Sequence, residues 1–312
     1  MTLLFLLYGA LAVFLAGNLV RLARILIMPV HLRWELYPVP KGPRDRVRYG
    51  GSYFEELDWW TRPERRGLRG ELRHIVSELL LFKGVRQHNR QLWFWSWLLH
   101  IALYLLVVNM GWAVLVSLLE RVGPAAWTSS ISPVLRTLIM SFSWISAPGG
   151  VMGSLGLIIY RSTSPKMKAF TSLASILNLS VILLLFASGL LGQITDSAMI
   201  DNLISLAGAL LTFHAPPSVQ GFALAHIVIL ALFLSYFPFT HMTHMYMKFF
   251  TYHKVRWDDV PYRDGERLHE SIARCLAFPV SWSGPHIKGE GKKNWADVGV
   301  EEVNNAGQKT RS

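Results

Sequence analysis

The chain has 312 residues, of which 52% are hydrophobic, and it carries a formal net charge of +11. This composition is too apolar for an ordinary soluble domain. Nucleic acid binding would account for the charge but not for the long apolar stretches, so we expect no nucleic-acid partner. Cys275 is the single cysteine, which excludes an internal disulfide, and without a C-x-x-C-H sequence no heme is attached in the c-type manner.

Long apolar stretches dominate the sequence, and a membrane span needs about 20 such residues. The sequence therefore predicts an all-α bundle of five transmembrane helices in a lipid membrane. The predicted spans are 3–29, 92–119, 134–160, 169–193 and 219–247.

Basic residues alternate between the connections. The loop 31–91 carries 13 Lys and Arg residues and the segment 248–312 carries 11, whereas the connection 194–218 has none. Because basic loops stay in the cytoplasm, this pattern predicts an N-terminus outside and a C-terminus in the cytoplasm. We expect a membrane domain over 1–250, with 31–91 as its cytoplasmic loop. The tail 251–312 would be cytoplasmic, either docking a partner or partly disordered.

Two further helices are predicted outside the spans. Residues 70–93 place Leu72, Ile75, Val76 and Leu79 at helical spacing, which is typical of an amphipathic helix lying along the membrane face. Residues 198–212 are predicted to form a short interfacial helix on the outside.

Four histidines lie within predicted spans, and an ionisable residue at membrane depth indicates a functional site. His226 and His244 are 18 residues apart, about five helical turns and roughly 27 Å, so on one helix they would share a face, one near each membrane surface. His241 lies about 60° off that face, and Pro238 is expected to bend the helix. The simpler alternative is neutral imidazoles hydrogen-bonded between helices.

A ligand near each surface is what a diheme cytochrome b needs, because neutral imidazole binds heme iron well. His100, near the cytoplasmic start of the second span, is the natural partner of His244. The partner of His226 should lie ten residues beyond His100, where Met110 stands; a thioether also ligates heme iron. Met110 is nevertheless about 80° away from the face of His100, so packing is an alternative role for it, and Asn109 faces the opposite way.

Two stretches carry a resemblance to a known family. Both resemble the gamma-subunit family of respiratory nitrate reductase: AHIVILALFLSYFPFTHMTHMYMKFFTYH and LLHIALYLLVVNMGW. Members of that family are five-span diheme b cytochromes with a cytoplasmic C-terminus. The resemblance covers roughly 1–250. The stretches KFFTYHKVRWDD and PVSWSGPHIKGEGKKNWADV are most similar to the branch found in sulfate-reducer-type complexes.

The resemblance implies two b hemes. His100 and His244 would be the axial pair of the inner heme, and His226 one ligand of the outer heme. The family has a second histidine where this chain has Met110. The outer heme is therefore expected to be ligated by His226 and Met110, ligated elsewhere, or absent. His241 has no ligand role in the family pattern.

The resemblance also implies a quinone site near the outer heme, for menaquinone or a similar quinone. His214, Arg121 and Trp112 are candidates by position, although Arg121 and Trp112 would serve equally as interfacial anchors. The implied partners are a cytoplasmic iron–sulfur subunit similar to that of heterodisulfide reductase and, as a further option, an extracytoplasmic cytochrome c. The implied location is a prokaryotic cytoplasmic membrane.

The predicted function is electron exchange between the quinone pool and a cytoplasmic iron–sulfur subunit through b hemes, in a direction that the sequence leaves open. Two other functions stay open. One is a transporter in which the histidines relay protons. The other is a heme-free membrane anchor for a soluble enzyme.

Overall fold

A computed structural model of the chain describes residues 1–27, 57, 68–244, 247, 250, 265, 267–284 and 287–300. Most of the predicted loop 31–91 and the end of the tail lie outside these residues. The chain divides into two units, Met1–Leu19 with Glu71–Thr243, and Val20–Gly70 with His244–Ser312.

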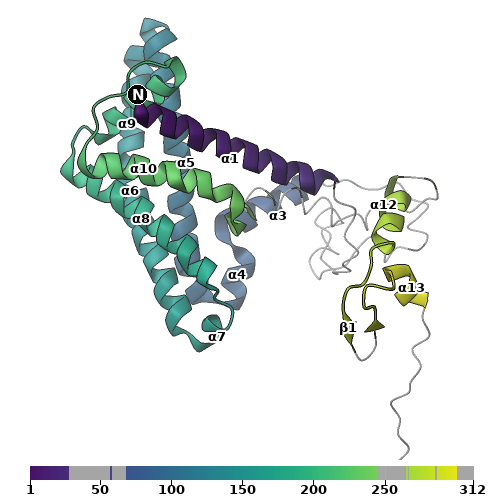
Figure 1. Cartoon of the computed structure of the whole chain (residues 1–312). Helices are drawn as coiled ribbons and strands as arrows, with labels where there is room; N and C mark the ends of the chain where they lie inside the picture. The colour runs from purple at the N-terminus through teal and green to yellow at the C-terminus, as the bar shows by residue number, and fades with distance from the viewer. Residues whose placement is uncertain are drawn as a thin grey trace, which may run out of the picture. The chain divides into compact units, whose positions relative to one another are not determined.

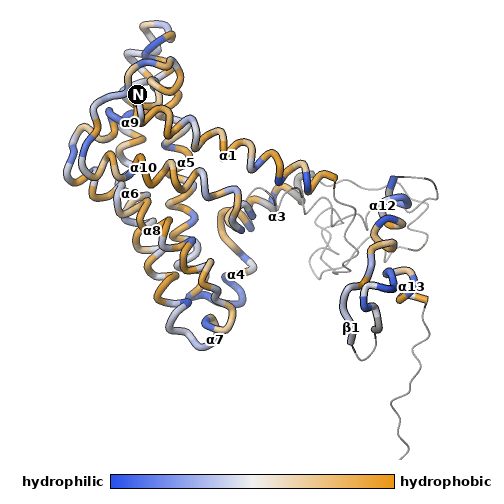
Figure 2. Tube along the Cα trace, viewed as in Figure 1, coloured by the Kyte–Doolittle hydropathy of each residue, from blue (hydrophilic) through white to orange (hydrophobic). Residues whose placement is uncertain are grey.

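Five helices in the described residues are long and apolar enough to cross a membrane. The predicted all-α, multi-span fold is confirmed, and Figure 2 shows how hydrophobic residues run along most of these helices. The first four are α1 (Thr2–Ile27), α5 (Arg90–Val122), α6 (Ala125–Thr163) and α8 (Leu173–Thr195). The fifth, Gly221–Phe239, consists of α10 (Gly221–Tyr236) and the short 3-10 turn that follows it. The short helix predicted at 198–212 is also present as α9 (Met199–Thr212).

Helices α5 and α6 are longer than a bilayer requires. Their 33 and 39 residues correspond to about 50 and 58 Å, against a hydrocarbon core of about 30 Å. The Asn89 side chain caps the start of α5 by accepting from the backbone N–H of Leu92. Gly123 follows the end of α5, and Pro124 precedes the start of α6. A short helix, α7 (Pro165–Lys168), lies between α6 and α8.

Helices α5, α6 and α8 pack closely because α6 carries glycines where it meets its neighbours. At Gly153 a Cβ atom would lie only 2.7 Å from the backbone nitrogen of Leu99 on α5. Small residues allow this approach, which favours helix association where no hydrophobic effect drives it. The core built on this packing contains Leu99, Ala102, Leu157, Leu179, Ile182, Leu185, Phe186 and Phe233.

A second core joins the first part of α1 to α9 and α10. Tyr8 donates a hydrogen bond of 2.5 Å to the carbonyl oxygen of Leu210 and stacks on Phe213. Figure 1 accordingly shows the N-terminus beside α9. The buried members of this core are Leu4, Leu7, Ala10, Leu206, Ala209, Ile227 and Ala231.

The amphipathic segment 70–93 is not one helix, so that prediction was wrong in its extent. The chain forms α3 (Leu68–Leu81) and α4 (Lys83–His88). Phe82 separates them with a left-handed backbone (φ 45°), and the extended Asn89 separates α4 from α5. Asn89 is a better helix cap than a helix interior residue, which explains the second break.

The fifth span also departs from the prediction of one helix over 219–247. Helix α10 ends at Tyr236, and two short 3-10 turns follow, η3 (Phe237–Phe239) and η4 (His241–Thr243). Pro238 cannot donate a backbone hydrogen bond, and the expected bend is therefore a helix end. The face shared by His226 and His244 assumed a continuous helix, so that geometric argument does not apply.

The second unit contains a small structured part of the tail. It has α12 (Arg267–Leu276), the antiparallel pair β1 (Ser283–Gly284) and β2 (Ile287–Lys288), and α13 (Trp295–Val300). Val280 and Cys275 are buried there, at 1% and 5% exposure. The described part of the tail is therefore folded, while its predicted docking role stays a prediction.

Candidate functional site

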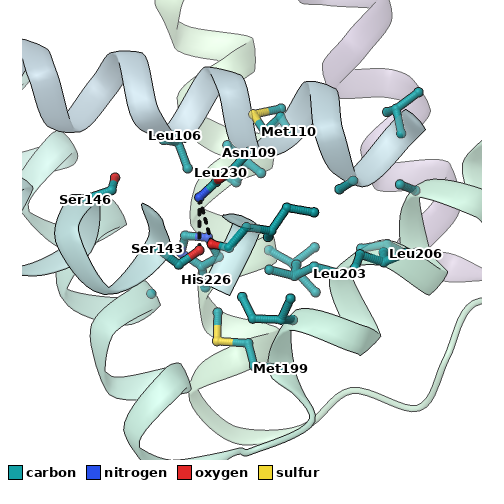
Figure 3. Close-up of a pocket in the computed structure, with 18 of the residues that line it drawn as sticks. Leu106, Asn109, Met110, Ser143, Ser146, Met199, Leu203, Leu206, His226 and Leu230 are labelled. Atoms are coloured by element: carbon teal, nitrogen blue, oxygen red, sulfur yellow. Dashed lines mark hydrogen bonds between the residues drawn. The ribbon is translucent and has the colours of Figure 1, made fainter. Parts of the chain in front are cut away.

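A cavity of about 310 Å³ lies within the first unit. Helices α5, α6, α8, α9 and α10 line it, together with two leucines of α1, and Figure 3 shows several of these side chains. Its volume is at the lower end of the range for ligand pockets in proteins. Most lining residues are aliphatic. The polar exceptions are Asn109, Ser143, Ser146, Gln193 and His226.

His226 is the ionisable residue of this lining, and its side chain is buried. Its Nδ1 lies 3.0 Å from the carbonyl oxygen of Leu185 and 3.3 Å from the hydroxyl of Ser188. A carbonyl oxygen only accepts, so Nδ1 carries the hydrogen and Nε2 holds the lone pair. Histidines that bind metals are oriented in the same way, by an N–H donated to a carbonyl group.

The position of the His226 ring depends on Gly189 of α8. A Cβ atom there would lie 3.1 Å from both Cε1 and Nδ1 of the ring, closer than ordinary van der Waals contact. Glycine thus lets the imidazole approach α8 closely enough to reach Leu185. Sequence reasoning found His226 but missed Gly189, which is one of several glycines in an apolar stretch.

The structure brings Met110 and His226 to the same cavity, although helical periodicity alone does not select Met110. Met110 is 38% exposed, whereas a second lining methionine, Met199, is 2% exposed. The Met199 sulfur packs against Gly192, one helical turn from Gly189. Met199 was not predicted as a site residue because it lies in α9, outside the predicted spans.

Asn109 extends from α5 toward Ser143 (Figure 3) and is 7% exposed. Its Nδ2 donates to the Ser143 hydroxyl at 3.0 Å and to the carbonyl oxygen of Ile139 at 3.3 Å. Gln193 of α8 donates from Nε2 to the carbonyl oxygen of Gly189 at 3.3 Å. The amide oxygens of Asn109 and Gln193 are buried and have no hydrogen-bond partner among the described residues.

His100 does not line this cavity. Its Nδ1 lies 2.6 Å from the carbonyl oxygen of Ser96, so Nε2 is the accepting nitrogen, as in His226. The ring packs against Phe82, with centroids 4.8 Å apart, and against Tyr104. His244 begins the second unit, so its pairing with His100 stays a prediction.

His241 lies beside a buried polar group of α8. Its Nδ1 is 3.3 Å from Nδ2 of Asn178, whose Oδ1 accepts a hydrogen bond of 2.8 Å from the Tyr236 hydroxyl. This neighbourhood gives His241 a polar contact within the protein. No ligand role was predicted for it.

The three residues proposed for a quinone site by position do not line the cavity. Trp112 packs on Phe142, with ring centroids 5.1 Å apart. The Arg121 guanidinium lies against the backbone of Gly208 in α9. His214 is exposed, and its Nδ1 lies 3.0 Å from the carbonyl oxygen of Thr212. Their assignment to a quinone site stays a prediction.

Within the described ranges, no group of three or more His, Cys, Asp or Glu residues is placed to hold a metal ion. This finding has no bearing on heme, since the porphyrin supplies four of the iron ligands and the protein only the axial ones. No family model, curated protein sequence or solved structure matches the chain.

Proposed function

We propose that this chain is a membrane cytochrome b subunit. It would pass electrons between the quinone pool of a prokaryotic cytoplasmic membrane and a cytoplasmic iron–sulfur subunit similar to that of heterodisulfide reductase. The resemblance to the gamma-subunit family of respiratory nitrate reductase motivates this proposal. The extracytoplasmic cytochrome c remains a further candidate partner.

One structural observation supports the proposal most strongly. The two histidines placed inside long apolar helices, His100 and His226, both turn Nδ1 to a backbone carbonyl oxygen, that of Ser96 and of Leu185. Nε2 is then the nitrogen with the lone pair, which an imidazole needs either to bind a heme iron, as proposed for His100, or to accept a proton. In a membrane interior, such a polar group requires a functional or structural reason.

Each residue has a defined task in this proposal. His100 and His244 would hold the inner b heme, and His226 marks the outer end of the route. The iron of a bound heme supplies one-electron chemistry. A hydroquinone that reacts at the outer side loses two electrons in single steps and two protons, and a neutral imidazole is a suitable proton acceptor there.

The proposal is tested by measuring heme b per chain with a pyridine hemochrome assay on the purified full-length protein. We expect His100→Leu to lose the inner heme. His88→Leu is a matched control, because the Nδ1 of His88 also lies close to a backbone carbonyl oxygen (Gly84, 2.8 Å), but the residue is exposed on α4. This control should keep the heme content of the wild type.

A folded wild-type chain without heme would overturn the proposal. The histidines would then belong to a proton relay or to a structural role in a heme-free anchor. Proton uptake into vesicles separates these two functions, because a passive anchor conducts no protons.

A further inference from the structure

The unpartnered oxygens of Asn109 and Gln193 impose a chemical requirement on the cavity around His226. Both amides have a fixed orientation. The Asn109 NH₂ group faces the carbonyl oxygen of Ile139, and the Gln193 NH₂ group faces that of Gly189. Turning either amide over would bring two acceptor oxygens together, so the oxygen of each must be the group without a partner.

A buried acceptor without a donor is costly, and such groups usually have a water, an ion or a ligand as partner. A b heme does not supply the missing donors. Its edge carries methyl and vinyl groups and two carboxylates, which accept hydrogen bonds. His226 suits an axial ligand, but Asn109 and Gln193 do not suit the edge of a porphyrin.

We propose that this cavity binds the hydroquinone form of a membrane quinone, in place of a second heme. The two hydroxyl groups of the hydroquinone would donate to the amide oxygens of Asn109 and Gln193, and the aliphatic lining would contact the ring. The inference names the substrate site of the proposed function and rests on that function for its electron acceptor, the inner heme.

The same two oxygens make the site selective for the reduced ligand. A hydroquinone has two O–H donors, whereas the oxidised quinone presents two carbonyl oxygens. With the quinone bound, the acceptors of the protein and of the ligand would face each other unsatisfied. A site built to hydrogen-bond a hydroxyl rejects analogues that lack it, so the oxidised product leaves more readily than the substrate.

His226 adds a third acceptor with a different property. Amide oxygens do not take up protons near neutral pH, whereas Nε2 of a neutral imidazole does. The hydrogen that Nδ1 donates to Leu185 keeps this lone pair on Nε2. His226 is thus the lining group that can receive a proton from a bound hydroxyl.

The hydrogen-bond requirement is tested by isothermal titration of the full chain in lipid nanodiscs under anaerobic conditions. The probes are 1,4-naphthalenediol and 1,4-dimethoxynaphthalene, which share a ring system, although the second has no hydroxyl donor. We expect the diol to bind at least about tenfold more tightly, the effect of one buried acceptor left unsatisfied. Equal affinities, or no binding of the diol, would overturn the inference.

Variants assign the preference to the two amides. Asn109→Leu and Gln193→Leu should each reduce the discrimination between diol and diether. Asn18→Leu is the matched control, because Asn18 also donates to a backbone carbonyl (Phe14, 2.8 Å) and has an unpartnered Oδ1, but it does not line the cavity. Discrimination that survives in both cavity variants would overturn the assignment.

Heme content separates this inference from the proposed function. We expect one b heme per wild-type chain and the same content in His226→Leu. If His226→Leu loses one of two hemes, the cavity holds a heme and the inference fails, while the proposed function stands. If the wild type has no heme, the proposed function fails, and the diol titration still decides whether the cavity binds hydroquinone.

Discussion

The contact between α5 and α6 gives the sharpest stability prediction, because two glycines one turn apart on α6 face α5 differently. At Gly153 a Cβ atom would lie 2.7 Å from the backbone nitrogen and 2.8 Å from the Cα of Leu99. At Gly149 the atoms nearest to such a Cβ would be side-chain carbons of Leu98 and Ala102, at 3.6 and 3.8 Å. The same glycine-to-alanine change is therefore a clash at one position and an ordinary contact at the other.

The magnitudes follow from these distances. Carbon atoms pack best at about 3.5–4.0 Å, so Gly153→Ala requires the two backbones to separate by roughly 1 Å. Overpacking of this kind costs about 1–3 kcal/mol. Gly149→Ala has no clash, and replacing a helical glycine by alanine should stabilise the protein by about 0.5–1 kcal/mol.

The assay is unfolding of the purified chain in mixed detergent micelles, followed by tryptophan fluorescence. We expect the free energy of unfolding to fall for Gly153→Ala and to stay level or rise for Gly149→Ala. Equal effects of the two changes would refute the packing described for α5 and α6. Since Leu99 precedes His100, Gly153→Ala should also weaken heme binding, and heme content reports this separately.

Three further predictions concern other contacts. Gly189→Ala should displace the His226 ring, because the new Cβ lies 3.1 Å from it, and titration should show weaker binding of 1,4-naphthalenediol with little change in helix content by circular dichroism. The Arg136 guanidinium lies 2.8 Å from the Glu120 carboxylate and also contacts Asp201, and the side chains of Arg136 and Glu120 are one-third exposed. Arg136→Gln removes both ion pairs and should lower the unfolding free energy by about 1 kcal/mol, and by less in high salt. An effect independent of salt would contradict the ion pairs. Burial raises the pKa of the Cys275 thiol above its value in the unfolded chain. The unfolding free energy of the unit that contains Cys275 should therefore fall as pH rises above about 8.5, where the unfolded thiol ionises. Cys275→Ala should abolish this pH dependence, and a pH dependence that remains in the variant would exclude the thiol as its cause.

The apolar stretches predicted the helices well because their signal is local. Five runs of about 20 apolar residues became five long helices, and the predicted segment 198–212 became α9. The breaks were harder to predict. Phe82 adopts a left-handed backbone without being glycine or asparagine, and nothing in its neighbouring residues indicates this.

The cavity was only partly predictable, since it depends on contacts between helices far apart in sequence. His226 was found because a histidine stands out in an apolar span. Gln193 and Met199 were missed because each gains its role only when α8 and α9 meet α10 around the cavity. Gly189 was missed for the same reason, because its role is to leave space for the ring of His226, a residue 37 positions further along the chain.

The arrangement of α5 explains how one helix can serve two sites. His100 and Asn109 are nine residues apart, which places them on opposite faces and about 14 Å apart along the axis. Asn109 faces the cavity, while His100 packs against Phe82 and Tyr104 away from it. In the proposed function, electrons from a hydroquinone in the cavity would therefore pass α5 to reach a heme on His100. Gly153 packs on Leu99, the neighbour of His100 and ten residues from Asn109, so a clash at Gly153 should lower heme content more than it weakens hydroquinone binding.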